Sequence, residues 1–284
     1  MRFIRGNPAS GRPGRNASAG SPLAHEETSM NKPLEHKLAL VTGASRGIGA
    51  AIAARLARDG AAVLVNYSAS ADRADAVVKA ILAEGGQAES IGADLSTSEG
   101  VSGLLGAIDG AFDGRFKGRL DILVNNAGTV DYGPFLESTD DSYDRQFNLN
   151  VRAPVALSRN VAQRMITAGW GRIINVGSAL GEAAPLPGVT LYVATKFALR
   201  GFTKGLSREL GPFGITVNTV QPGPTETELA PQPGSDAHAT MTRLASVGRF
   251  ARVDEIAAAV AYLASPEAGY TNGESLTVDG GWNA

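Results

Sequence analysis

The sequence predicts an α/β fold in which helices cover both faces of a single parallel sheet. Short apolar runs alternate with segments of helical periodicity along most of the chain, and this alternation is typical of parallel sheets. The first apolar run ends in a glycine-rich turn that precedes a helix. The length of 284 residues and the hydrophobic content of 43% suit a globular protein with a sizeable core. Because no repeat beyond the alternation and no linker divides the chain, we expect one domain over residues 36–284.

Residues 1–35 differ in composition from the rest of the chain. Residues 6–18 are rich in Gly, Pro, Asn and Ser and have no hydrophobic period, which predicts disorder. Four arginines in this part would suit a targeting segment, but neither an apolar core of signal-peptide length nor an amphipathic helix accompanies them. We expect a disordered N-terminal extension, with Met30 as an alternative start of the protein.

Seven short runs are predicted to be strands. Most are apolar, as expected for strands buried in a parallel sheet, and the first ends in glycines. The predicted strands are residues 38–41, 62–66, 88–91, 121–124, 172–176, 215–220 and 275–278.

Helices are predicted between these strands from the spacing of their apolar residues. Gly85 and Gly86 end the second helix, and Pro154 lies inside the fourth. The predicted helices are residues 48–58, 72–84, 96–112, 139–168, a segment through Tyr192 to about Leu210, and 253–264.

The composition excludes several classes of function. The chain has no cysteine, so disulfides, thiolate catalysis and cysteine-bound zinc are excluded. Three scattered histidines argue against a histidine metal site and against a Ser-His-Asp triad, so we expect no metal. A net charge of −2 gives no reason to expect nucleic acid or an anionic membrane as a partner. No run approaches the roughly 18 apolar residues of a membrane span, and we expect a cytoplasmic protein.

The turn after the first predicted strand is a candidate dinucleotide site. Residues 42–49 read TGASRGIG, and three glycines at this spacing allow a tight turn and close approach of the backbone to phosphate. The helix that follows offers free N–H groups and the positive end of its dipole. We expect the cofactor to contact Gly43, Ser45, Arg46, Gly47, Ile48 and Gly49.

The end of the second predicted strand favours NADP(H) over NAD(H). NAD-selective sites place an acid there to hold the ribose 2′-hydroxyl, whereas this chain has Asn66-Tyr67-Ser68. Ser68 can donate a hydrogen bond to a 2′-phosphate and Arg46 supplies a cation. The alternative for Arg46 is a solvated surface residue.

Two further strand ends are expected to meet the cofactor. Asp94, followed by Leu95, could accept a hydrogen bond from the adenine amino group, although an acid at a helix N-terminus is the alternative for Asp94. Asn126, Ala127 and Gly128 follow the fourth strand, where small residues and amides would line the cofactor and tie neighbouring strands together.

Tyr192 and Lys196 are candidates for acid–base catalysis. They are four residues apart, so they share one face of the predicted helix. An ammonium beside a phenol favours the phenolate, and we expect it to lower the pKa of Tyr192 from about 10 toward neutrality. The alternative is an ordinary surface pair.

Taken together, these motifs resemble the short-chain dehydrogenase/reductase family. The resemblance implies a three-layer Rossmann-type fold with a doubly wound sheet of seven strands, usually in a homotetramer. It also implies nicotinamide-dependent interconversion of a ketone and a secondary alcohol. It covers residues 37–284 and rests on TGASRGIG (42–49), NNAG (125–128), Asn150, Ser178, YVATK (192–196), Asn218 with QPGPTET (221–227), and VDGG (278–281).

The resemblance assigns catalytic roles by position. Tyr192 would exchange the proton with the carbonyl oxygen, and Lys196 would lower its pKa and hold the nicotinamide ribose. Ser178 would orient the substrate oxygen, with a plain loop serine as the alternative. Asn150 would help to hold a water of a proton relay, and Asn148 is a nearby competitor. The segment that closes over the nicotinamide would contain Pro222, Gly223, Thr225 and Thr227.

The substrate side departs from the family pattern in two places. Residues 222–248, the segment expected to cover the substrate, contain several prolines, so we expect a stiffened segment without the continuous helix common there. Residues 249–252 (RFAR) replace a glycine-containing form. The apolar residues of 182–191 favour an apolar or mixed substrate over a sugar.

The pattern is closest to 3-oxoacyl-thioester reductases and related carbonyl reductases. An acyl-carrier partner would need a basic patch, to which Arg152, Arg159, Arg164, Arg172 and Arg200 could contribute. The second hypothesis is a nucleotide-binding regulatory protein of the same fold with little turnover. The complete set of Asn150, Ser178, Tyr192 and Lys196 favours the reductase, because a sensor would need only the glycine-rich turn.

Overall fold

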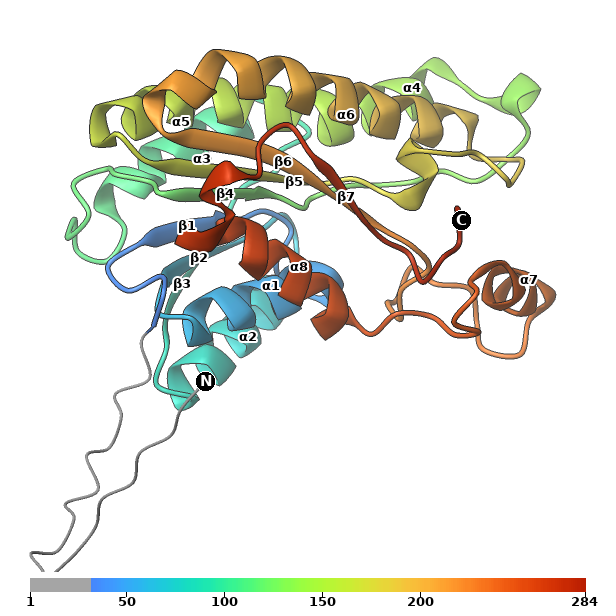
Figure 1. Cartoon of the computed structure of the whole chain (residues 1–284), viewed down its shortest axis with the longest axis horizontal. Coiled ribbons are helices and arrows are strands. Elements are labelled where there is room, and N and C mark those ends of the chain that lie inside the picture. The colour runs from blue at the N-terminus through green and yellow to red at the C-terminus, as the bar shows by residue number, and fades with distance from the viewer. Residues whose placement is uncertain (1–31) are drawn as a thin grey trace, which may run out of the picture. The chain divides into compact units, whose positions relative to one another are not determined.

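The computed structural model describes residues 32–284, which form one compact unit around a seven-stranded sheet (Figure 1). All strand pairs are parallel, and the strand order is β3-β2-β1-β4-β5-β6-β7. The order reverses between β1 and β4, and in such sheets ligands bind outside the carboxyl ends of the strands at this reversal. The strands are β1 (Leu38–Val41), β2 (Ala62–Tyr67), β3 (Gln87–Gly92), β4 (Ile122–Asn125), β5 (Gly171–Val176), β6 (Ile215–Pro222) and β7 (Ser275–Val278).

Helices cover both faces of the sheet, as predicted (Figure 1). Ala39 and Val41 of β1 join one apolar core, while Leu38 and Leu40 join the other, because alternate strand residues point to opposite faces. The first core packs against α1 (Gly47–Arg58), α2 (Ala71–Ala83) and α8 (Val253–Ala264). The second packs against α3 (Ser98–Gly110), α5 (Ala153–Ala168) and the end of α6 (Thr190–Leu210).

The structure confirms the predicted strands and most of the predicted helices to within a few residues. The domain begins earlier than predicted, because the side chain of Leu34 is fully buried in the first core. The disordered extension is predicted over residues 1–35. Residues 1–31, including the alternative start Met30, lie outside the described residues, whereas residues 32–35 belong to the compact unit. Within residues 32–284, the helices are too short or too polar to cross a membrane.

The helical stretch predicted over residues 139–168 is present as a continuous run over residues 140–168, with one local change of helix type. A π-helix, Asn148–Arg152, separates α4 (Asp140–Phe147) from α5. Pro154 lies in the first turn of α5, directly after the π-helix and inside the continuous helical run. Because proline has no N–H, the ladder of backbone hydrogen bonds is interrupted there. Wide helical turns of this kind often occur at functional sites.

The segment after β6, for which we expected no continuous helix, contains one short helix. Residues Asp236–Leu244 form α7, and the hydroxyl of its N-cap residue, Ser235, accepts from the N–H of His238. We call residues 227–250 the lid. The backbone closes the base of the lid, because the N–H of Ala251 donates to Pro224 O (2.9 Å) and the N–H of Glu226 donates to Ala251 O (2.9 Å).

Candidate active site

A cleft of about 530 Å³ opens at the carboxyl ends of the strands. It brings together every predicted site residue except Asn150. The predicted residues that line it are Gly43, Ser45, Arg46, Gly47, Ile48, Gly49, Ser68, Asp94, Leu95, Asn126, Ala127, Gly128, Ser178, Tyr192, Lys196, Pro222, Gly223, Thr225 and Thr227.

The glycine-rich turn forms a tight cradle at the start of α1. Gly43 and Gly47 have φ values of +60° and +56°, which side chains rarely adopt. A Cβ on Gly49 would lie 2.5 Å from both Asn126 Nδ2 and Gly43 O. Among the described residues, no side chain caps the N-terminus of α1, so its N–H groups are available to an anion. The cradle therefore fits the phosphates of a dinucleotide.

The adenosine end of the cleft carries no acid at the end of β2. Asn66 is buried, and its side chain accepts from the N–H of Gly43 (3.3 Å) and donates to Ala93 O (3.2 Å). Ser68 is exposed to the cleft. The guanidinium of Arg46 lies 3.0 Å from Glu228 Oε2, so Arg46 is paired with the lid rather than simply solvated.

Asp94 lines the cleft but also has a structural role. One of its carboxylate oxygens accepts from the N–H (3.0 Å) and the hydroxyl (2.8 Å) of Ser96, which closes the turn before α3. Asp94 therefore supports the turn that leads into α3, whereas the N-cap residue of that helix is Thr97.

The amides after β4 tie strands together, as expected. Asn126 Nδ2 donates to Thr42 O (2.8 Å) and to Gly43 O (3.1 Å). Asn125 Nδ2 donates to Asn175 Oδ1 (2.8 Å) across the β4–β5 pair. These bonds hold the glycine cradle against the floor of the cleft.

Ser178, Tyr192 and Lys196 meet on the opposite wall. Ser178 follows β5, while Tyr192 and Lys196 lie on one face of α6. Lys196 is only 4% exposed, and its ammonium donates to Val176 O (3.0 Å) and lies 5.3 Å from the centroid of the Tyr192 ring. The predicted pair is therefore not an ordinary surface pair.

The expected lowering of the pKa of Tyr192 is not found. Burial raises the pKa of Tyr192 to about 12, although the adjacent Ser178 hydroxyl opposes this rise. Burial also lowers the pKa of Lys196 to about 8. Desolvation disfavours the charged forms of both groups, and the ammonium is directed to a backbone carbonyl rather than to the phenol oxygen. The phenol is therefore a protonated group at neutral pH.

Asn150 lies behind the cleft, in the π-helix. It is 1% exposed, and its Nδ2 donates to Thr129 O (2.8 Å) and to Thr195 Oγ1 (3.1 Å). Its Oδ1 accepts from the N–H of Thr129 (2.8 Å). The side chain thus anchors the loop after β4 to α6, and both of its amide hydrogens are used by the protein. A Cβ on Gly128 would lie 3.3 Å from Asn150 Oδ1 and 3.6 Å from Lys196 Nζ.

Gln221 is a site residue that the sequence analysis missed. Its Oε1 accepts from the N–H of Ser178 (2.7 Å), and its side chain is fully buried. It therefore fixes the backbone that carries the Ser178 hydroxyl. Its position in the sequence gives one indication of this role, because Gln221 is a polar residue at the end of a buried strand, directly before Pro222.

The substrate side of the cleft is largely apolar and aromatic. Leu186 and Val189 line it, in agreement with the apolar wall predicted over 182–191. Four further lining residues, which no sequence motif indicated, come from the loop after β4, the lid and the C-terminal segment. They are Tyr132, Met241, Phe250 and Trp282.

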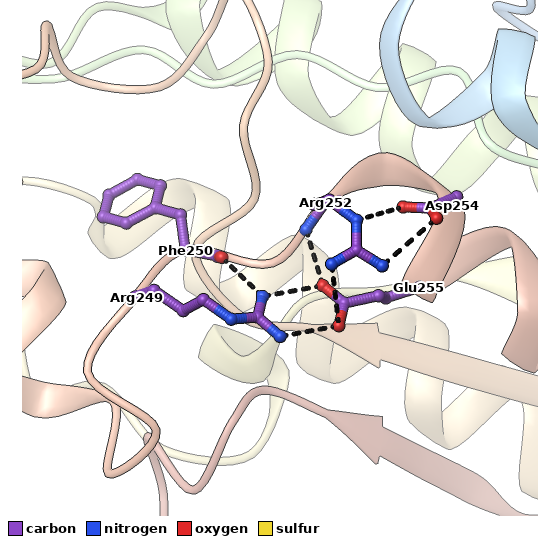
Figure 2. Close-up of polar contacts among 5 residues, drawn as sticks. All are labelled: Arg249, Phe250, Arg252, Asp254 and Glu255. Carbon is purple, nitrogen blue, oxygen red and sulfur yellow. Dashed lines mark hydrogen bonds and ion pairs between the residues drawn. The ribbon is translucent and has the colours of Figure 1, made fainter.

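An ion-pair cluster explains the unusual RFAR segment at the end of the lid (Figure 2). The guanidinium of Arg249 binds both carboxylate oxygens of Glu255, at 2.7 and 2.8 Å. Glu255 Oε2 also accepts from the N–H of Arg252 (2.8 Å), which starts α8. These hydrogen bonds lower the pKa of Glu255 to about 2, so the lid is clamped to α8 at neutral pH.

The arginines considered for a basic patch are not equivalent. Arg172 is 3% exposed, lies 4.4 Å from the Trp170 ring and donates to Ser265 O (3.2 Å). Arg164 pairs with Asp109 at 2.7 Å. Arg172 therefore cannot belong to a surface patch.

Comparisons with known proteins agree with this geometry. The family model described as enoyl-(acyl carrier protein) reductase matches residues 43–283. A cyclic-di-GMP-binding biofilm dispersal mediator protein of Escherichia coli K12 is 39% identical over 248 residues, which cover 87% of this chain and 98% of that protein. A 3-oxoacyl-(acyl-carrier-protein) reductase FabG of Vibrio harveyi shows the same identity over 248 residues, with the same coverage.

A solved structure extends the similarity to three dimensions. The crystal structure of a short-chain dehydrogenase from Burkholderia cenocepacia J2315 in complex with NADP has a TM-score of 0.82 and 45% identity, covering 89% of this chain and 100% of that chain. The fold, the cleft and the family match agree along nearly all of the described residues. The chain therefore belongs to the short-chain dehydrogenase/reductase family of oxidoreductases.

Proposed function

We propose that the protein is an NADP(H)-dependent oxidoreductase that interconverts a ketone and a secondary alcohol, with Tyr192 as the proton donor. The observation that carries this proposal is the convergence of Ser178, Tyr192 and Lys196 on the cleft wall that faces the glycine cradle. A nicotinamide cofactor bound in this cleft would supply the hydride for the carbonyl carbon.

The protein's own residues would handle the proton and the developing charge. The pKa of Tyr192, about 12, keeps the phenol protonated at neutral pH, so it can donate to the carbonyl oxygen during reduction. Ser178 would hold the same oxygen through a hydrogen bond. Lys196 carries an ammonium below its pKa of about 8 and would stabilise the phenolate that remains.

The adenosine end supports NADP(H) rather than NAD(H). No carboxylate lies at the end of β2, where NAD-selective sites place an acid for the ribose 2′-hydroxyl. Arg46 and Ser68 line this end of the cleft. The Burkholderia structure, with NADP bound, is consistent with this preference.

The substrate is proposed to be a 3-oxoacyl thioester or a related ketone. The similarity to the Vibrio reductase supports the thioester, and the apolar wall formed by Leu186, Val189 and Phe250 suits an acyl or aryl chain.

A panel of ketones assayed with NADPH and with NADH tests the proposal. The panel contains a 3-oxoacyl thioester, a diketone, an aromatic ketone and a sugar-derived ketone. Tyr192→Phe should bind NADPH as the unaltered protein does and lose about 10²- to 10⁴-fold in turnover, because the proton donor is removed. Unchanged turnover in this variant would contradict the assigned mechanism.

A second candidate function is that of a nucleotide-binding regulator with little turnover. The similarity to the Escherichia coli biofilm dispersal mediator supports it. Calorimetric titration with cyclic di-GMP, run beside the ketone panel, separates the two candidates. Binding of this nucleotide without turnover on any ketone would favour the regulator, and NADPH-dependent turnover would favour the reductase.

A further inference from the structure

Two arginines from different elements converge on a single carboxylate beside the adenosine end of the cleft. Arg73, on α2, places Nη1 at 2.7 and 2.9 Å from the two carboxylate oxygens of Glu228. Arg46, before α1, places Nη1 3.0 Å from one of the same oxygens. The two guanidinium groups hold the pKa of Glu228 below its usual value, with Arg73 as the larger influence. Glu228 is therefore an anion bound by two cations.

This carboxylate belongs to the lid and not to the sheet or to α2. A Cβ on Gly47 would lie 3.5 Å from Thr227 Cγ2, so the start of the lid runs directly over the glycine cradle. Glu228, the next residue, reaches past the cradle to Arg73 on α2. The ion pairs thus connect the lid to the part of the cleft that distinguishes the two nicotinamide cofactors.

The surroundings are those of an anion site. Ser68 and Ser70 line the cleft beside Arg46. Among the described residues, no side chain caps the N-terminus of α2, so its first N–H groups are available. One carboxylate leaves a net positive charge on the two guanidinium groups. A phosphate monoester carries about −1.5 to −2 at neutral pH and matches them better.

We propose that Arg46 and Arg73 together bind the 2′-phosphate of the cofactor, and that Glu228 is an internal anion which the phosphate displaces. The inference rests on the proposed preference for NADP(H) and adds Arg73 as a specificity-determining residue. Displacement of Glu228 releases the start of the lid, so the lid responds to the 2′-phosphate and not only to the nicotinamide.

Binding of 2′,5′-ADP and of 5′-ADP, measured by calorimetry, tests the proposal without turnover. In Arg73→Gln, the affinity for 2′,5′-ADP should fall about three- to ten-fold, because one charged hydrogen-bond donor is lost. In Glu228→Gln, it should rise about two- to five-fold, the range for an exposed ion pair. Both effects should be much smaller for 5′-ADP, and both should fade in about 1 M salt.

The matched controls are Arg58→Gln and Glu84→Gln. This pair lies 3.8 Å apart on α1 and after α2, with similar exposure, and should leave both affinities unchanged. Hydrogen exchange supplies a second readout, since amides of residues 227–232 should exchange faster with 2′,5′-ADP than with 5′-ADP.

The two nucleotides separate an error in the NADP(H) preference from an error in the roles of Arg73 and Glu228. If the unaltered protein binds the two nucleotides equally, the preference for NADP(H) is wrong. If it prefers 2′,5′-ADP but Arg73→Gln keeps that preference, or Glu228→Gln weakens it, the preference stands and this inference is overturned.

Discussion

At the scale of single residues, two neighbouring groups of the cleft wall have opposite pKa shifts for the same reason. Burial raises the pKa of Tyr192 to about 12 and lowers that of Lys196 to about 8, because desolvation disfavours charge on either group. The phenol therefore keeps its proton across the neutral range, while the ammonium loses its proton only slightly above it.

We expect reduction to weaken as Lys196 loses its charge. The pKa of about 8 means that the ammonium is mostly present below this pH and mostly lost above it. The kcat/KM for ketone reduction should fall roughly ten-fold for each pH unit above about 8, since the phenolate then lacks its cation. The measurement is a pH profile from about 6 to 10, with circular dichroism to show that the fold persists. A flat profile would exclude a catalytic role for this charge.

A second prediction at this scale concerns the glycine cradle. Gly49→Ala places a Cβ 2.5 Å from Asn126 Nδ2 and from Gly43 O, so the cradle must open. The free energy of unfolding should fall by about 1–3 kcal/mol, and NADPH binding should weaken with it.

The matched control for this change is Gly103→Ala. Gly103 is an exposed glycine of α3, and a Cβ added to it would meet no atom within 4 Å. This change should stabilise the protein by up to about 1 kcal/mol, because alanine favours the helix. Chemical denaturation checks both variants, and equal effects would show that the cradle is not tightly packed.

At the scale of elements, ion pairs hold the C-terminal end of the lid. Arg249, Arg252 and Glu255 connect the end of the lid to the first turn of α8 (Figure 2). The carboxylate also lies at the positive end of the α8 dipole. The lid is therefore held at its base by backbone hydrogen bonds and at its C-terminal end by these ion pairs, with the helix α7 in between.

Glu255→Gln should loosen the lid, because the bidentate ion pair with Arg249 is lost. Amides of residues 236–250 should exchange several-fold faster, an effect of the size expected for an exposed ion pair. In Asp254→Asn, which removes only the exposed pair between Asp254 and Arg252, the lid should exchange as in the unaltered protein. Equal exchange in both variants would assign no role to the clamp.

The pH dependence of the clamp follows from the lowered pKa of Glu255. A carboxyl with a lowered pKa in the folded state stabilises that state above its unfolded value of 4.5. The contribution is lost as the pH falls from 4.5 toward about 2. Lid exchange, corrected for the intrinsic rate, should therefore be independent of pH near neutrality and increase only in acid.

At the scale of the whole molecule, we expect self-association through exposed aromatic residues. Tyr143 on α4 and Phe197 on α6 are 46% and 43% exposed, and both helices offer faces that could pack against another subunit of a homotetramer. We expect a homotetramer, so light scattering should give about four times the 29.3 kDa of one chain.

Phe197→Asp should shift this protein toward smaller species, because a charge would be buried in the interface. Leu82→Asp is the control, since Leu82 is similarly exposed, at 52%, on α2. A monomer in the unaltered protein would contradict the expected assembly.

The sequence by itself determined the sheet, the glycine cradle and the identity of most cleft residues. These features depend on local patterns: apolar runs such as residues 38–41, glycines whose backbone must approach phosphate, and the four-residue spacing of Tyr192 and Lys196. Such patterns can be recognised in the sequence because they depend only on residues that are close together along the chain.

Tertiary structure decided what each polar group meets. Only the fold brings Gln221 to Ser178, directs Lys196 to Val176 O, and places Glu228 between Arg46 and Arg73, 182 and 155 residues away in sequence. The direction of the Tyr192 pKa shift also reversed, because it depends on burial. Burial and long-range hydrogen bonds arise only when elements pack together, so their energies cannot be predicted from a local segment of the sequence.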